Sequence, residues 1–208
     1  MVLGSQKSEP PLKPESGSLR TTEDGRWAQS NESDEGLMAR FCDGDLPAFE
    51  VLFQRYGQVI RAYLARLVGA VHADDLAQAT FLSVVRARGR FDRKAHFKPW
   101  LYAIATNAAR DYFRRRREEL TQTGELSSEL ADEGGSEARD EGLERAVQNA
   151  LAQLPQSQRV AIVMHRFQNL SFAEVAQALD LSESAVKVRA HRGYKRLREL
   201  LRGLWDSR

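Results

Sequence analysis

Apolar residues in the first half of the chain recur every three or four positions, as they do on one side of an amphipathic helix. Asp45 is placed to cap such a helix, and Pro47 falls in its first turn, where proline is tolerated. The pattern therefore predicts a helix with a buried stripe. That stripe comprises Phe49, Leu52, Phe53, Tyr56, Ile60, Tyr63, Leu64 and Leu67.

Two further helices follow in this half. Acidic residues at one end and arginines at the other predict a helix over 74–88, since these charges complement the helix dipole. Gly89 is its stop signal. A basic, aromatic loop over 90–98 comes next, and Pro99 is expected to start a third helix.

The second half predicts four helices, over 143–154, 156–167, 171–179 and 183–201. No strand-like alternation competes with them, so we expect an all-α fold. The last two helices, joined by the short turn 180–182, have the order and spacing of a helix-turn-helix.

Local signals support the helix-turn-helix. Ser171 and Glu174 form a capping box, with Leu170 and Val175 at the positions of a hydrophobic staple, and Ser182 can cap the final helix. At 100° per residue, one side of that helix is apolar and faces inward: Val186, Ala190, Gly193, Leu197 and Leu201. The opposite side carries Ser184, Val188, His191 and Lys195, flanked by Lys187, Arg189 and Arg192.

Charge and composition divide the chain into four parts. Residues 1–33 are polar and proline-rich, with net charge −1, and we expect a disordered extension. Residues 34–117 carry +6 and 143–208 carry +5, and each is long enough for a small helical domain. Between them, residues 118–142 carry −8 and contain several glycines, which predicts a flexible acidic linker. Two basic domains favour two contacts with a polyanion.

Several classes of protein are excluded by what the sequence lacks. Cys42 is the one cysteine, so there is no disulfide framework or cysteine-based zinc site. The four histidines have no metal-ligand spacing, and no phosphate-binding glycine loop occurs, so we expect no metal, no cofactor and no enzyme activity. No apolar run approaches the roughly 20 residues of a membrane span. A cytoplasmic protein without membrane insertion is expected.

The run 97–117 combines aromatic residues, a helix of small residues and four consecutive arginines. Aromatic rings stack on or wedge between bases, and arginines neutralise phosphates. The combination favours a helix that meets DNA where the strands separate. An amphipathic helix with a solvated basic end remains the simpler alternative.

Three ordered motifs resemble the extracytoplasmic-function (ECF) sigma factors. Residues 74–82 read DDLAQATFL, residues 97–111 read FKPWLYAIATNAARD, and residues 182–192 read SESAVKVRAHR. The resemblance covers about 34–117 and 143–204. It implies a sigma factor that binds core RNA polymerase, directs it to promoters and helps to melt the minus-ten element.

The resemblance also assigns residues to three surfaces. It implies contact with the clamp coiled coil of the largest polymerase subunit through Asp74, Asp75, Gln78, Phe81 and Leu82. For the minus-ten element it implies Lys94, His96, Phe97, Lys98, Trp100, Asn107, Arg110 and Arg114. For the minus-thirty-five element it implies the helix-turn-helix from Ser171 to Ala190 and beyond, with Ser184, Lys187, Val188, Arg189, His191, Arg192 and Lys195. Further implied partners are the flap of the second-largest subunit and an anti-sigma factor.

The chain departs from the family pattern at a few positions. Ala79 stands where glutamate is frequent, and Asp180 replaces the usual turn glycine. Val188 and Tyr194 replace a frequent serine and arginine, which should alter promoter choice. Gly193 lies inside a helix, and we expect a close backbone contact there.

Two other functions remain open from the sequence. One is a DNA-binding regulator that uses only its helix-turn-helix, and the other is an adaptor that binds polymerase without reading DNA.

Overall fold

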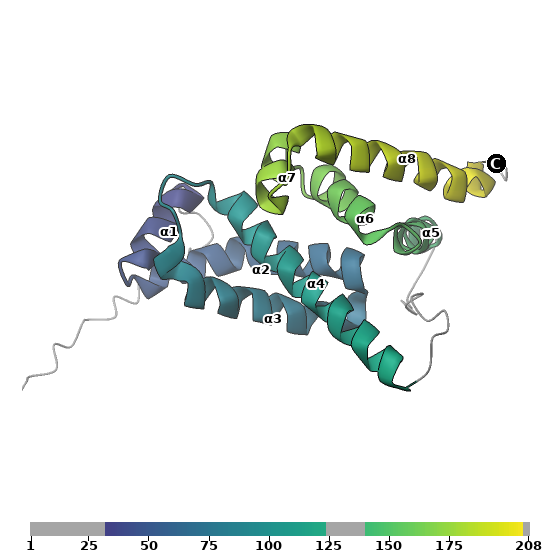
Figure 1. Ribbon diagram of the computed structural model, residues 1–208. Coiled ribbons are helices and arrows are strands. Elements are labelled where there is room, and N and C mark those ends of the chain that lie inside the picture. The colour runs from purple at the N-terminus through teal and green to yellow at the C-terminus, as the bar shows by residue number, and fades with distance from the viewer. Residues whose placement is uncertain (1–31, 124–139, 206–208) are drawn as a thin grey trace, which may run out of the picture.

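A computed structural model describes residues 32–123 and 140–205 as two helical bundles that lie against each other (Figure 1). All regular elements within these two ranges are helical, which confirms the predicted all-α fold. The first bundle consists of α1 (Asp34–Cys42), α2 (Leu46–Val68), α3 (Ala70–Ala87), the 3-10 turn η2 (Arg88–Arg90) and α4 (Phe97–Thr123). The second consists of α5 (Asp140–Ala152), α6 (Gln156–Ile162), the π-helix η3 (Val163–Phe167), α7 (Phe172–Leu179) and α8 (Glu183–Trp205).

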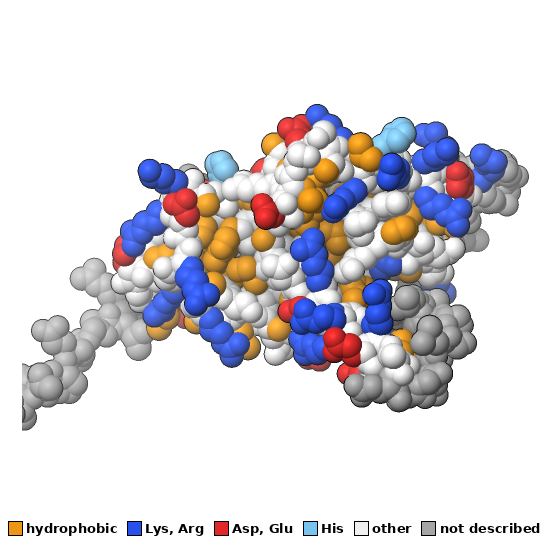
Figure 2. Space-filling model, in the orientation of Figure 1, with side chains coloured by type: hydrophobic (Ala, Val, Ile, Leu, Met, Phe, Trp, Pro, Cys, Tyr) orange, Lys and Arg blue, Asp and Glu red, His pale blue; other side chains and the backbone are white. Residues whose placement is uncertain are grey.

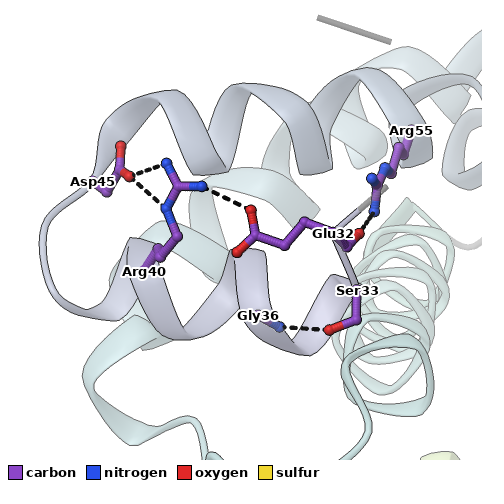
Figure 3. Close-up of polar contacts among 6 residues, drawn as sticks. All are labelled: Glu32, Ser33, Gly36, Arg40, Asp45 and Arg55. Atoms are coloured by element: carbon purple, nitrogen blue, oxygen red, sulfur yellow. Dashed lines mark hydrogen bonds and ion pairs between the residues drawn. The ribbon is translucent and has the colours of Figure 1, made fainter. Parts of the chain in front are cut away.

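The entry into α1 is fixed by polar contacts that Figure 3 shows in close-up. Ser33 is the N-cap, and its Oγ accepts a hydrogen bond from Gly36 N at 3.1 Å. Arg40 pairs with Glu32 at 2.7 Å and with Asp45 at 2.5 Å. Asp45 is the N-cap of α2 as predicted, but its carboxylate makes no cap hydrogen bond because Arg40 holds it. Glu32 and Ser33, assigned to the extension from the sequence, are thus part of the first bundle.

An aromatic cluster joins α1, α2 and α3. Phe41 and Phe49 stack with their ring centroids 4.7 Å apart, and the ring edge of Phe81 meets Phe53 at 4.9 Å. The stripe predicted along α2 packs in or against the core, with one exception, since Phe53 is 48% exposed. These ring contacts between residues far apart in the sequence fix the three helices against one another.

The junction between α2 and α3 is tighter than the sequence suggested. Gly69 has a φ of 93°, a conformation that glycine adopts readily, and α3 begins at the next residue. The helix therefore starts four residues before the predicted Asp74. Asp74 lies within α3, where its carboxylate pairs with Arg61 of α2 at 2.5 Å.

The helix α4 is longer at both ends than predicted. It starts at Phe97, and Pro99 is buried in its first turn. At the other end it continues through the arginines 114–117 to Thr123, because arginine and glutamate are good helix formers.

The predicted linker 118–142 is correspondingly shorter. Residues 118–123 belong to α4, and 140–142 belong to α5. Its remaining part, 124–139, lies outside the described residues, as do residues 1–31 of the predicted extension.

Two sets of helix contacts join the bundles. Helix α7 packs on α4, while α5 and η3 pack on the end of α2 (Figure 1). The sequence predicted two separate domains and did not reveal this contact.

Candidate functional site

The exposed face of α3 carries most of the residues assigned to polymerase binding. Asp74, Asp75 and Gln78 are exposed, and Leu82 is exposed by 55%. Phe81 is only 4% exposed and packs on the rings of α2, so its assignment to the contact surface is wrong. The remaining four form an acidic surface with one apolar side chain.

A groove of about 310 Å³ runs between α3 and α4 beside this face. Ala79 lies in it, at the position where the family often has glutamate, so the small side chain leaves the groove open. Arg115 is a lining residue that the sequence analysis missed. Its signal was the spacing of four residues from Asp111 and eight from Asn107, which places all three on one face of α4. The groove is lined by Leu76, Ala79, Ser83, Ile104, Asn107, Ala108, Asp111 and Arg115.

The loop before α4 places basic side chains at one end of the first bundle. Lys94 and His96 are exposed, and His96 Nδ1 lies 3.6 Å from a carboxylate oxygen of Glu35. Lys98 is directed toward the second bundle, where its Nζ donates to the backbone oxygen of Gln168 at 3.0 Å. The loop therefore presents a cationic edge close to the bundle contact.

The aromatic residues at this end belong mainly to the core. Phe97 is 0% exposed and meets the ring of Tyr56 edge-on at 5.5 Å, so its assignment as a DNA contact is wrong. Trp100 is half-buried, with its ring 4.9 Å from that of Phe91. Trp100 therefore combines core packing with partial exposure.

The outer face of α4 presents the amide and guanidinium groups expected from the sequence. Asn107, Arg110 and Arg114 are all exposed. Arg110 Nη1 donates to Asn107 Oδ1 at 3.2 Å, and Arg114 pairs with Asp111 at 2.9 Å. These contacts hold the side chains along the helix, where the amide and both guanidinium groups remain accessible.

The helix-turn-helix forms as its local signals predict. Ser171 Oγ accepts from Glu174 N at 3.2 Å, and the Glu174 carboxylate accepts from Ser171 N at 2.7 Å, which confirms the capping box. Asp180 adopts the left-handed conformation at φ 54°, in the place of the usual glycine. Ser182 Oγ accepts from Ala185 N at 3.2 Å and so caps α8.

The faces of α8 also match the periodicity. Val186 and Ala190 are buried, and a Cβ on Gly193 would lie 2.5 Å from Ile162 Cδ1 of α6. This distance confirms the expected close approach. The opposite face is open to solvent and, with Arg189 half-buried at its edge, carries Ser184, Lys187, Val188, Arg189, His191, Arg192 and Lys195.

Contacts at the start of α8 hold Lys187 in place. Its Nζ pairs with Glu183 at 2.6 Å and lies 5.9 Å from the centroid of the Phe172 ring. The ring of His165 stacks on the same Phe172 ring, with the centroids 4.0 Å apart. Val188, next to Lys187, is 48% exposed. Glu183 was not among the predicted residues, although its i,i+4 spacing to Lys187 is a recognisable signal.

Basic side chains gather over the C-terminal part of α4 and along α8, on the same side of the molecule (Figure 2). Across the parts of the chain that the structure describes, His, Cys, Asp and Glu side chains form no group able to hold a metal ion. No helix of these parts is long and apolar enough to cross a membrane.

Two family models match this chain, one on each bundle. Sigma-70 region 2 matches residues 52–119, and Sigma-70, region 4, matches residues 144–197.

Relatives and solved structures agree with these matches. The chain is 42% identical over 166 residues to the RNA polymerase sigma factor CarQ of Myxococcus xanthus, covering 79% of this chain and 95% of that protein. It is 35% identical to the ECF RNA polymerase sigma factor SigF of Caulobacter vibrioides, over 81% of this chain and 93% of that protein. A structure of CnrH in complex with the cytosolic domain of CnrY matches with a TM-score of 0.64 and 28% identity, covering 83% of this chain and 99% of that one. The chain therefore belongs to the ECF subfamily of sigma-70 factors, non-enzymatic proteins that bind core RNA polymerase and start transcription at specific promoters.

Proposed function

We propose that the exposed α3 face docks this sigma factor on core polymerase, at the clamp coiled coil of the largest subunit. Asp74, Asp75 and Gln78 supply acceptors for a basic partner helix, and Leu82 supplies an apolar contact. Arg61 holds the Asp74 carboxylate in place at 2.5 Å. Such a surface has no use in a simple DNA-binding regulator, and its presence beside two basic surfaces is the observation that carries the proposal.

The minus-ten surface comprises the loop before α4 and the outer face of that helix. Asn107 offers both an amide donor and an acceptor to a base edge, which suits an unpaired base. The half-buried Trp100 can offer the accessible part of its ring to a base while it packs on Phe91. Cationic residues hold the phosphates around them. The surface consists of Lys94, His96, Lys98, Trp100, Asn107, Arg110 and Arg114.

The minus-thirty-five surface is the outer face of α8. In a helix-turn-helix this face enters the major groove, and its N-terminal residues reach the base edges. Val188 and His191 are assigned to base reading, with Val188 packing on a thymine methyl. Lys187 and Arg192 serve as phosphate anchors, while Ser184, Arg189 and Lys195 border the contact. We also assign the flap of the second-largest polymerase subunit as a partner of this bundle.

An anti-sigma factor is a further proposed partner. CnrH was solved in complex with the cytosolic domain of CnrY, and the RpoE sigma factor of Bartonella quintana was solved with the anti-sigma factor NepR. The second match has a TM-score of 0.65 at 24% identity and supports only the fold. A cytoplasmic location follows from the proposed work with polymerase.

The test of the polymerase dock is a charge reversal. Replacing Asp75→Lys and Gln78→Lys should weaken core binding several-fold or more, because the acidic face then repels a basic partner helix. A matched control is Glu199→Lys with Gln153→Lys, two exposed positions in the second bundle with the same change in net charge. Affinity for core polymerase is measured by fluorescence anisotropy, with circular dichroism to check folding. Equal affinity of the reversed variant and the control would exclude this face as the dock.

A further inference from the structure

The groove between α3 and α4 combines apolar side chains from both helices with polar side chains from α4. The polar ones are Asn107, Asp111 and Arg115, which share one face of that helix at intervals of four residues. A long side chain with an apolar stem and a polar end matches both parts of this groove of about 310 Å³. The apolar part consists of Leu76, Ala79, Ile104 and Ala108.

The polar side chains of the groove offer unused hydrogen-bond donors. Asn107 Oδ1 accepts from Arg110 at 3.2 Å, and the Asp111 carboxylate pairs with Arg114 at 2.9 Å, so these oxygen-bearing groups are already engaged. Within the described residues, the Asn107 amide nitrogen and the exposed Arg115 guanidinium have no hydrogen-bond partner, and Arg115 forms no ion pair. The groove therefore suits an acceptor with negative charge, which a guanidinium binds through two parallel hydrogen bonds.

Position 79 decides whether this chain can supply that negative charge itself. The ECF family often has glutamate here, whose carboxylate would lie in the groove. In this chain the side chain of Ala79 ends at Cβ, and Arg115 lines the same groove with its charge unpaired. A partner molecule can supply the carboxylate that this chain lacks at position 79.

The surroundings of the groove favour a protein partner over DNA. Gln78 of the proposed polymerase dock directly precedes Ala79, so one edge of the groove borders that dock. The exposed carboxylate of Asp75 lies about one turn before Ala79 on the same helix and repels a phosphate backbone that follows this edge. A single acidic side chain meets less repulsion, because only its end carries charge and that end lies at Arg115.

We propose that this groove binds one acidic side chain, a glutamate or an aspartate, of core polymerase, with Arg115 as its ion-pair partner. The inference rests on the proposed docking of the α3 face, which it extends. The small side chain of Ala79 keeps the groove open. Position 79 therefore determines which core polymerase the chain fits, because a glutamate here would occupy the groove and pair with Arg115 in its place.

The test compares two ways of removing this contact in the full chain. Arg115→Gln removes the cation, and Ala79→Glu fills the groove and supplies a carboxylate from the chain itself. Each should weaken binding to purified core polymerase by about threefold to tenfold, measured by fluorescence anisotropy, with circular dichroism unchanged. The double variant should lose little more than Ala79→Glu alone, since both changes remove the same contact.

The matched control is Arg117→Gln, which changes the net charge by the same amount. Arg117 is an exposed arginine of α4 that lies about 200° around the helix from Arg115. This variant should bind core polymerase with the affinity of the parent.

A cross-linking measurement identifies the partner group. Arg115→Lys places a primary amine in the groove, and a carbodiimide joins an amine to a contacting carboxylate as an amide, with loss of water. Mass spectrometry of the cross-linked complex with core polymerase should find position 115 joined to an aspartate or glutamate of the largest subunit. The same treatment of Arg117→Lys should give no such product at position 117.

Three results overturn the inference. One is an unchanged core affinity in both Arg115→Gln and Ala79→Glu, and another is a cross-link pattern of Arg115→Lys equal to that of Arg117→Lys. The third is a loss confined to binding of a single-stranded minus-ten oligonucleotide, which would assign the groove to DNA. Failure of the proposed dock is distinct, because the variant with Asp75→Lys and Gln78→Lys then binds core polymerase as well as its control.

Discussion

The two bundles reach a defined structure by different means. The α1–α4 bundle depends on contacts between helices, such as Phe41 on Phe49 and the edge of Phe81 on Phe53. The α5–α8 bundle depends more on local devices, among them the Ser171 capping box and the left-handed Asp180. In the first bundle, one sequence motif therefore contains both core residues and surface residues, as in 74–82, where Phe81 is buried and Asp75 is exposed.

This difference also separates the functional surfaces. In α8, the residues proposed to read DNA and the core residues lie on opposite faces, and all the proposed reading residues are exposed except Arg189, which is half-buried. In α3 and α4, buried Phe81 and Phe97 alternate with exposed Asp75 and Asn107. A motif residue of the first bundle can therefore act by packing alone, whereas one on the outer face of α8 cannot.

The largest expected effect tests the core role of Phe97. Phe97→Ala should lower the free energy of unfolding by about 3–5 kcal/mol, because it empties a fully buried aromatic site. Chemical denaturation measures this loss. The exposed neighbour His96→Ala should change stability by less than about 0.5 kcal/mol. Equal, small losses in both variants would show that Phe97 is not a core residue and would remove the contrast between the bundles.

The next effect concerns the close approach of α8 to α6. Gly193→Leu should destabilise the α5–α8 bundle by about 1–3 kcal/mol through overpacking against Ile162. Hydrogen exchange, read separately in the two bundles, measures the loss. Gly142→Leu is the control, because a Cβ there meets nothing within 4 Å. Similar protection in both variants would contradict the tight packing.

A smaller effect concerns the capping box. Burial raises the pKa of Glu174, but the hydrogen bonds from Ser171 outweigh it, and the net pKa lies below the ordinary value. A lowered carboxyl pKa adds stability above the unfolded-state pKa and loses it as the pH falls through the folded-state pKa. Ser171→Ala should therefore cost about 1 kcal/mol at neutral pH, and the part due to the carboxylate should shrink as the pH falls below about 4, the ordinary pKa range of glutamate. Thermal melts from pH 7 to pH 3 measure this change.

The control for the capping box is Ser157→Ala, an exposed serine in the first turn of α6. Its effect on stability should be small and independent of pH over this range. A cost of Ser171→Ala that stays constant down to pH 3 would exclude a contribution from the Glu174 carboxylate.

The smallest expected effect concerns Val188. If its side chain packs on a thymine methyl, Val188→Ser should lose about 0.8 kcal/mol at one base pair, the value of one buried methyl-sized group. Selection of binding sites from promoters randomised through the minus-thirty-five element measures the preference. Arg192→Gln is the comparison, since loss of a phosphate anchor should weaken all sequences alike and reduce the salt dependence. An unchanged preference profile for Val188→Ser would show that this position does not read sequence.

The structure shows how far sequence reasoning reaches in each bundle. Ser171 and Asp180 were interpreted correctly because caps and turns depend on residues only a few positions apart, and the inward place of Gly193 follows from the periodicity of α8. The burial of Phe81 and Phe97 depends on which helices pack against them, which a spacing within one helix does not reveal. In both cases the motif was recognised and the exposure of the residue was not.

Helix ends and the bundle contact were the other features that sequence missed. The start of α3 depends on the positive φ of Gly69, which composition alone does not indicate. Tyr102 and Gln168 join the bundles by a hydrogen bond of 2.8 Å but are 66 positions apart and share no periodic pattern. Long-range polar pairs of this kind leave no local signal, so two separate domains were the natural expectation.

The most direct test of the account is run-off transcription with purified core polymerase on templates randomised through both promoter elements. We predict that adding the chain yields transcripts whose templates are enriched at both the minus-ten and the minus-thirty-five positions, with a constant spacing between them. Each bundle would then read its own element. Enrichment at the minus-thirty-five element alone, or no transcript above that of core polymerase, would contradict the account.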